Sequence, residues 1–150
     1  MNYEQLGLLG IFIAGAVPWL EAIAFIPPGI AVGFDPILTV IAAVAGNAST
    51  IFLFAYSGAG VRNWLRKRRE AKGKSGESPR YQKALAAFDR YGIWGMAALG
   101  PIIIGSQFAA AASVAAGVKP MKVSILMTAS VLIWSIGLAW LMVALDIKIF

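Results

Sequence analysis

The sequence predicts an all-α integral membrane protein built from two inverted repeats, each a proline-broken re-entrant hairpin followed by a long transmembrane helix. Of its 150 residues, 59% are hydrophobic and 13% are charged, against roughly 45–50% and about 25% in soluble domains. Two apolar runs approach the roughly 20 residues that a helix needs to cross a bilayer. A short pattern also recurs in the two halves, which indicates an internal repeat.

The residue types that are missing limit the chemistry. The sequence contains no His and no Cys, which removes the usual general base, thiolate nucleophiles and most transition-metal sites. We therefore expect no enzyme, no cofactor and no metal. The net charge of +6 does not indicate nucleic-acid binding, because nine of the 13 basic residues lie within 62–83. In a membrane protein such a block marks the cytoplasmic side and secondarily contacts anionic lipids.

The first half contains two short apolar pieces and one long one. Residues 6–17 stop at Pro18, and residues 22–34 contain Pro27, Pro28 and Gly29. Neither piece spans a hydrocarbon core of about 30 Å, and we expect the prolines to interrupt helical structure. The run 36–57 is a full spanning helix that starts with a proline in its first turn. A signal peptide begins with basic residues, whereas this sequence has Glu4 there. We therefore expect the N-terminal segment to be retained rather than cleaved as a signal peptide.

The second half repeats this order after a polar centre. Residues 62–91 form a basic loop and, after Ser78 and Pro79, an amphipathic helix on the membrane surface. An apolar piece at 93–104 carries Pro101, Gly105 interrupts it, and residues 120–145 form a second spanning helix. One membrane domain, 1–150, thus contains a first repeat (1–61), the basic segment and a second repeat (92–150).

The internal repeat leaves two topologies open. The segment 31–36 (AVGFDP) aligns with 115–120 (AAGVKP). In the first topology each broken region crosses the membrane as a kinked helix, which makes four spans with both termini and the basic block cytoplasmic. In the second topology each broken region is a re-entrant hairpin and the halves are inverted, with Asp35 outside and Lys119 inside. The positive-inside rule and the short apolar pieces favour inversion.

Glu21 is the first candidate for a functional residue. A carboxylate at membrane depth costs about 2.5–3.5 kcal/mol and normally lines a protein or water cavity. Near a hairpin tip it could bind a proton or a cationic or amphiphilic substrate. The alternative is that Glu21 lies at a helix N-terminus near the interface and caps it.

Further candidates are polar groups and hairpin backbone. Gln107 and Ser106 occupy the counterpart of the Glu21 region, and Asn47 falls within the first spanning helix. Each could instead make an ordinary interhelical hydrogen bond. The freed backbone of the broken segments must be satisfied away from lipid, by a polar cavity or by neighbouring helices. The hairpin-backbone residues are Pro18, Pro27, Pro28, Gly29, Pro101 and Gly105.

Three segments carry a family resemblance. EAIAFIP (21–27) resembles the ExRxxxP signature of the small multidrug export proteins, a distant branch of the DedA (VTT-domain) superfamily. GNASTIFLFAYSGAG (46–60) is similar to that superfamily's Gly-Asp…Tyr…Gly helix, with Asn47 in place of Asp. The segment 88–120 resembles its second half.

The resemblance implies paired re-entrant hairpins of opposite orientation, often in a dimer, and a link to lipid movement and the proton-motive force. Ile23 stands where the signature has Arg, and the second hairpin has no arginine, which weakens the case for a phosphate-bearing lipid. We expect a multi-pass inner-membrane transporter or lipid flippase, with Glu21 as a proton- or substrate-binding group. Its partners would be membrane lipids, an amphiphilic substrate and a second copy. The alternative is a non-transporting scaffold or accessory subunit of a larger membrane complex.

Overall fold

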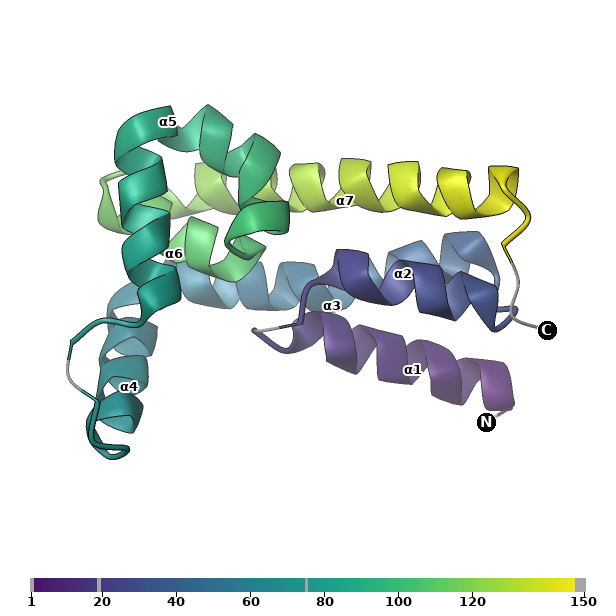
Figure 1. Cartoon of the computed structure of the whole chain (residues 1–150), viewed down its shortest axis with the longest axis horizontal. Coiled ribbons are helices and arrows are strands. Elements are labelled where there is room, and N and C mark those ends of the chain that lie inside the picture. The colour runs from purple at the N-terminus through teal and green to yellow at the C-terminus, as the bar shows by residue number, and fades with distance from the viewer. Residues whose placement is uncertain (1, 19, 75, 148–150) are drawn as a thin grey trace. The chain divides into compact units, whose positions relative to one another are not determined.

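The computed structural model describes residues 2–18, 20–74 and 76–147, and over these ranges the chain forms seven α-helices and no strand (Figure 1). The helices are α1 (Tyr3–Ala16), α2 (Ala22–Ala31), α3 (Pro36–Tyr56), α4 (Gly58–Glu70), α5 (Pro79–Ile103), α6 (Ser106–Ala115) and α7 (Pro120–Ala144). The predicted all-α fold is confirmed. By length and composition, α3 and α7 could cross a membrane, with 21 and 25 residues.

The chain divides into two compact units. Unit 1 comprises residues 1–50 and 128–150, and unit 2 comprises residues 51–127. Unit 1 therefore holds α1, α2, most of α3 and the C-terminal part of α7. Unit 2 holds the end of α3, then α4, α5 and α6, and the start of α7.

In unit 1, α1 and α2 pack against each other as a hairpin (Figure 1). Asn2 and Gln5 start α1 with a capping box, in which each side chain accepts a hydrogen bond from the other residue's backbone N–H. α1 also lies directly on α3. A Cβ atom at Gly46 would collide with the backbone oxygen of Phe12. Glycine is therefore required where these two backbones touch.

The prolines lie inside helices rather than between them. α2 contains Pro27 and Pro28, and α5 contains Pro101, so the expectation that these prolines interrupt helical structure is wrong. Each proline removes one helical hydrogen bond, and neighbouring helices can compensate for this loss in a membrane protein. The chain reverses instead between α1 and α2, where Pro18 lies, and at Gly105.

The repeated hexapeptide adopts the same backbone in both halves. α2 and α6 both have 10 residues, and each ends in a glycine turn, with φ 95° at Gly33 and 99° at Gly117. In each turn the glycine N–H donates to the carbonyl three residues earlier, and the next N–H donates to the carbonyl five residues before it. This is the glycine-based end of a helix, and a long helix follows it both times. The sequence repeat is thus also a repeat of local structure.

The glycine turns lead to a stability prediction. Gly33→Ala is expected to lower the thermal midpoint in detergent, because a left-handed conformation costs an L-residue about 1–2 kcal/mol. No neighbouring atom would clash with the added methyl group, so the loss would come from the backbone alone. Gly10→Ala, in an open position within α1, should raise the midpoint through helix propensity. Thermal unfolding followed by circular dichroism measures both, and an unchanged midpoint for Gly33→Ala would contradict the assignment.

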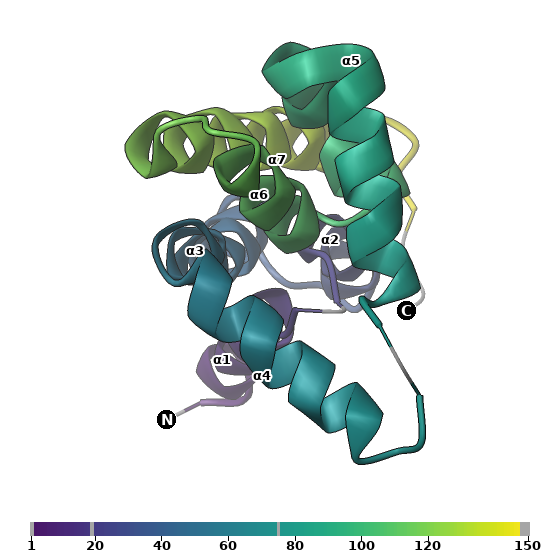
Figure 2. The ribbon, with the colours of Figure 1, turned by 90° about the vertical axis from the view of Figure 1, so that its left-hand side faces the viewer.

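In unit 2, α5 consists of two helical segments. Gly92, at φ 64° and ψ −170°, separates residues 79–91 from residues 93–103. These are the amphipathic helix and the short apolar piece expected from the sequence. The second segment and α6 form a hairpin through Ile104 and Gly105, and α6 contacts both α5 and α4 (Figure 2). Residues 106–113 of α6 are all buried.

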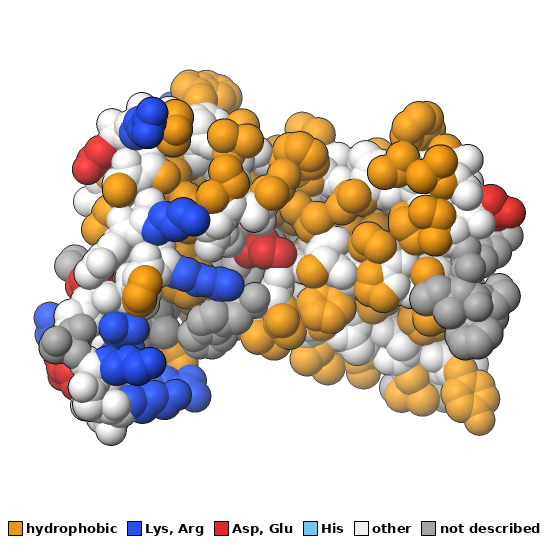
Figure 3. Space-filling model, in the orientation of Figure 1, with side chains coloured by type: hydrophobic (Ala, Val, Ile, Leu, Met, Phe, Trp, Pro, Cys, Tyr) orange, Lys and Arg blue, Asp and Glu red, His pale blue; other side chains and the backbone are white. Residues whose placement is uncertain are grey.

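The outer faces of the long helices are apolar. Ile37, Ile133 and Trp140 are each 70% exposed, and hydrophobic side chains dominate the face shown in Figure 3. Soluble proteins rarely expose apolar patches of this extent, so these faces suit contact with lipid tails. The Lys and Arg side chains gather over α4 and the start of α5 (Figure 3).

Candidate functional site

The α1–α2 hairpin turns at the level of the middle of α3. Near its start, a Cβ atom at Gly7 would overlap the ring of Phe34, next to the first turn of α3. Near its tip, the Asn47 Nδ2 atom donates to the Gly15 carbonyl oxygen at 3.3 Å. Asn47 lies about 16 Å along α3 from Pro36, roughly half of the hydrocarbon thickness. α2 then returns the chain to the end at which it began.

Asn47 holds the hairpin tip on α3. Its side chain is fully buried, and its acceptor, Gly15, lies in the last turn of α1, where carbonyl groups have no helical partner. The Thr50 hydroxyl donates in turn to the Asn47 carbonyl oxygen at 3.0 Å. The geometry thus supports the packing role considered for Asn47, and its part in substrate binding stays a prediction.

Glu21 lies at the tip, directly after the turn that contains Pro18. It is half-buried and occupies the N-cap position of α2, with φ −79° and ψ 141°. Its side chain makes no capping hydrogen bond. The N-terminal end of a helix carries partial positive charge, which favours a carboxylate there. A carboxylate is thus presented at the N-terminus of α2, about half-way along α3.

The second hairpin presents amides and hydroxyls at its tip. Gly105, at φ 109°, makes the turn, and Ser106 and Gln107 at the start of α6 are fully buried. The Ser106 hydroxyl donates to Gln107 Oε1 at 3.3 Å. The Phe108 ring meets the Phe54 ring edge to face, with centroids 5.8 Å apart. This tip is polar, buried and without formal charge.

The structure groups the predicted residues by unit. It brings Pro18, Glu21 and Asn47 to one tip in unit 1, and it brings Gly105, Ser106 and Gln107 to one tip in unit 2. Glu21 and Gln107 belong to different units, so their meeting across one site stays a prediction. The remaining predicted residues lie inside helices. Pro101 lies in the last turn of α5, next to the second tip, whereas Pro27, Pro28 and Gly29 lie farther along α2, where Gly29 packs against Ile11 and Thr39.

The sequence interpretation missed a set of buried hydroxyl groups. The side-chain oxygens of Thr39, Ser124, Thr128 and Ser135 are buried and make no hydrogen bond to any described part of the chain. Three of these residues, Ser124, Thr128 and Ser135, follow spacings of four and seven along α7 and therefore share one face. A buried hydroxyl without a partner costs about 1–3 kcal/mol. That spacing was the available signal. The buried residues of α7 also include Val123, Met127 and Val131, so its inward face combines hydroxyl groups with apolar side chains.

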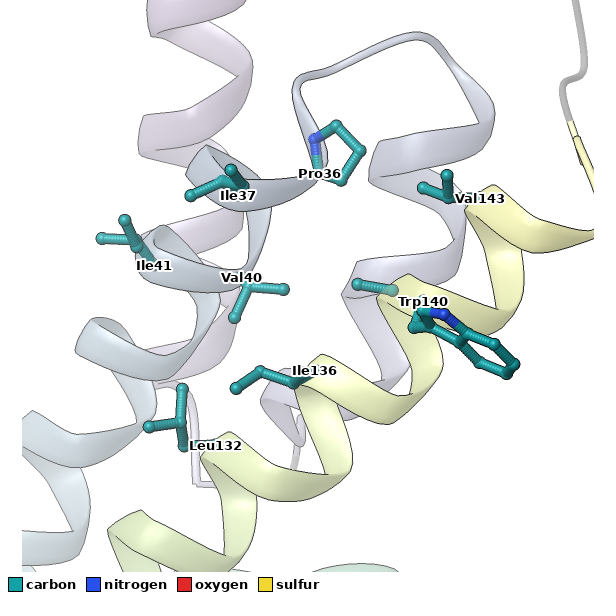
Figure 4. Close-up of a pocket in the computed structure, with 9 residues that line it drawn as sticks. Pro36, Ile37, Val40, Ile41, Leu132, Ile136, Trp140 and Val143 are labelled. Carbon is teal, nitrogen blue, oxygen red and sulfur yellow. The ribbon is translucent and has the colours of Figure 1, made fainter.

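Unit 1 also contains an apolar groove between α3 and α7, with a volume of about 490 Å³. Val40, Leu132 and Ile136 project into it from the two helices (Figure 4). A second pocket of about 310 Å³ shares Pro36 and Val143 with the groove and is also lined by Asp35 and Asp146. The first turn of α3 and the last turn of α7 therefore lie side by side, so in unit 1 the two long helices run in opposite directions.

Comparison with known proteins yields one match. The model of a family described as "Putative small multi-drug export protein" matches residues 21–136. The matched segment begins at Glu21, so it excludes α1 and the turn at Pro18, and it contains the second hairpin tip at Gly105, Ser106 and Gln107. No curated protein and no solved structure matches the chain. The family description and the apolar helices together indicate a membrane protein. Because the match covers more than half of the sequence, the chain belongs to the small multidrug export protein family.

Proposed function

We propose that this protein is a small membrane transporter or flippase that moves an amphiphilic or lipid-like molecule past the tips of two re-entrant hairpins. The observation that carries the proposal is the position of Glu21. The α1–α2 hairpin turns half-way along α3 and begins and ends near the same end of that helix, and this supports a segment that enters and leaves the membrane on one side. A carboxylate at that depth costs about 2.5–3.5 kcal/mol, so its presence favours a functional role over a purely structural one.

The direction of the long helices supports inverted repeats. Asp35 precedes α3 and Asp146 follows α7, and both line one pocket, so these two ends would face the same side of the membrane. Four ordinary spans would place Asp35 and Asp146 on opposite sides. Two re-entrant hairpins and two spanning helices would place them together. Broken segments in corresponding places of inverted halves are typical of transporters.

The charge distribution supports an orientation. Of the 13 Lys and Arg residues, 12 lie in unit 2 (51–127). By the positive-inside rule, the block 62–83 would be cytoplasmic and Asp35 would face the outside of a cell inner membrane. This orientation places the hairpin of unit 1 on the outer side and the hairpin of unit 2 on the inner side.

The orientation can be tested because the sequence has no cysteine. In intact cells, a membrane-impermeant thiol reagent is expected to label Asp35→Cys and Asp146→Cys. Lys119→Cys should be labelled only after permeabilisation, since its turn would face the cytoplasm. All three residues are exposed, so accessibility to water does not differ among them. Labelling of Lys119→Cys in intact cells would show that the halves are not inverted and that four ordinary spans are correct.

Transport itself is tested in proteoliposomes with an imposed pH gradient. Two probes are followed: transbilayer movement of a fluorescent phospholipid, read by dithionite quenching, and uptake of ethidium. Faster movement of either probe than in protein-free liposomes supports transport. No flux of either probe, together with purification in a fixed ratio with another membrane protein, would favour the scaffold or accessory-subunit alternative instead.

A further inference from the structure

We propose that the apolar groove of unit 1 and its adjoining acidic pocket form a binding site for a lipophilic cation. The inference rests on the proposed function in one respect, because it takes the bound molecule to be the transported substrate. Nine residues line the groove: Pro36, Ile37, Val40, Ile41, Leu132, Ile136, Ala139, Trp140 and Val143. All of them are apolar, and at about 490 Å³ the groove falls within the usual range for small-molecule sites, roughly 300–1,000 Å³.

The acidic pocket lies at the end of the groove nearest the helix termini. It shares Pro36 and Val143 with the groove, and its lining adds Asp35 and Asp146. Both carboxylates are exposed, so they would lie at the water interface while the groove extends beneath the lipid surface. A molecule with an apolar body and one positive charge could bury the body between α3 and α7 and place the charge between the two aspartates.

The charge of the whole unit favours a cation over an anion. In sequence, unit 1 contains four carboxylates, those of Glu4, Glu21, Asp35 and Asp146, and one basic side chain, that of Lys148. Carboxylates therefore outnumber basic side chains four to one in this unit, which disfavours an anionic headgroup. A cation would be attracted to the pocket, which has two carboxylates, those of Asp35 and Asp146, in its lining.

Two substitutions remove the charge without changing the local backbone. Asp35 caps α3, and its Oδ1 atom accepts from the Leu38 N–H at 2.9 Å. Asn serves equally well at this position. Asp146 ends α7 at φ 47°, a left-handed conformation that Asn adopts readily. The double variant Asp35→Asn/Asp146→Asn should therefore fold like the wild type.

The role of the groove is tested with two Trp substitutions on α7, one inside the groove and one control outside it. Ile136 lines the groove, so Ile136→Trp would fill it. Ile133 lies three residues earlier on α7, is 70% exposed and does not line the groove, so Ile133→Trp adds the same bulk elsewhere. Asp89→Asn removes an exposed carboxylate of unit 2 and serves as the control for charge.

The experiment measures equilibrium binding of tetraphenylphosphonium to the full chain in phosphatidylcholine nanodiscs, with empty nanodiscs subtracted. We expect the double Asn variant and Ile136→Trp each to weaken binding about tenfold, which corresponds to about 1.4 kcal/mol. Asp89→Asn and Ile133→Trp should bind like the wild type, and neutral triphenylphosphine should not compete effectively. Thermal midpoints within about 2 °C of the wild type would exclude misfolding.

Wild-type affinity in the double Asn variant, or equal competition by triphenylphosphine, would overturn the inference and assign the groove to a lipid acyl chain. Equal weakening by both Trp substitutions would also overturn it. These outcomes can be distinguished from those that would contradict the proposed transport function. A binding site without flux in proteoliposomes would contradict transport alone, whereas flux unaffected by Ile136→Trp would contradict only this site.

Discussion

Glu21→Gln is expected to lower the pH-driven flux of a transported probe at least tenfold while leaving the fold intact. Gln has nearly the same volume as Glu and keeps the polar group at the N-cap of α2, but it can neither release nor bind a proton and carries no charge. Gln can occupy the same N-cap position with the same backbone conformation, and a thermal midpoint within about 2 °C of the wild type would show that the fold is kept. The measurement is the initial rate of probe movement in proteoliposomes, with and without the pH gradient.

Two comparisons separate the possible roles of Glu21. If the carboxylate couples transport to protons, Glu21→Gln should abolish the response to the pH gradient and retain exchange of substrate across the membrane without it. If the carboxylate binds a cationic substrate, both activities should fall together. Glu4→Gln, which removes an exposed carboxylate from α1, is the matched control. A Glu21→Gln variant with wild-type flux would exclude Glu21 from the mechanism.

Gly46→Leu is expected to have the largest effect on stability, a loss of about 3 kcal/mol. The first added carbon would collide with the backbone oxygen of Phe12, and a backbone atom cannot rotate aside as a flexible side chain can. α1 would be displaced from α3, and the hydrogen bond from Asn47 to Gly15 would be lost with it. The expected observation is a lower unfolding midpoint in sodium dodecyl sulfate titrations, followed by circular dichroism.

The matched control for this substitution is Gly10→Leu, because Gly10 also lies in a unit 1 helix but has open space around it. It should change the midpoint by less than about 1 kcal/mol, through helix propensity alone. Similar midpoints for the two Leu variants would show that α1 does not lie against α3 as described. An Asn47→Leu variant should weaken the same contact without a collision. Its unfolding midpoint should therefore lie between those of Gly46→Leu and Gly10→Leu.

The sequence was sufficient to predict the two long helices, because apolar runs of that length have few alternatives. It also predicted the break at Gly105 and the correspondence between 31–36 and 115–120, where glycine and proline constrain the backbone directly. It failed at Pro27, Pro28 and Pro101. A proline disfavours a helix locally, but whether the helix continues depends on packing by other segments, which a local pattern does not contain.

The candidate site was predicted only in part. Glu21 was identifiable because a carboxylate in an apolar segment is unusual. An interhelical hydrogen bond was one of the two roles considered for Asn47, but its acceptor, Gly15, could not be predicted because it lies 32 positions earlier in the chain. The groove between α3 and α7 combines residues from both ends of the sequence, and each residue looks like an ordinary lipid-facing or core position. Only the tertiary structure shows that they enclose a space.

The kink at Gly92 has a consequence for how many times the chain crosses the bilayer. As one straight helix, the 25 residues of α5 would extend about 37 Å, more than the hydrocarbon thickness of about 30 Å. The conformation at Gly92, φ 64° and ψ −170°, is close to a region that essentially only glycine occupies. One achiral residue thus separates the charged segment 79–91 from the apolar hairpin arm 93–103, and under the proposed topology it keeps the two segments from forming one span.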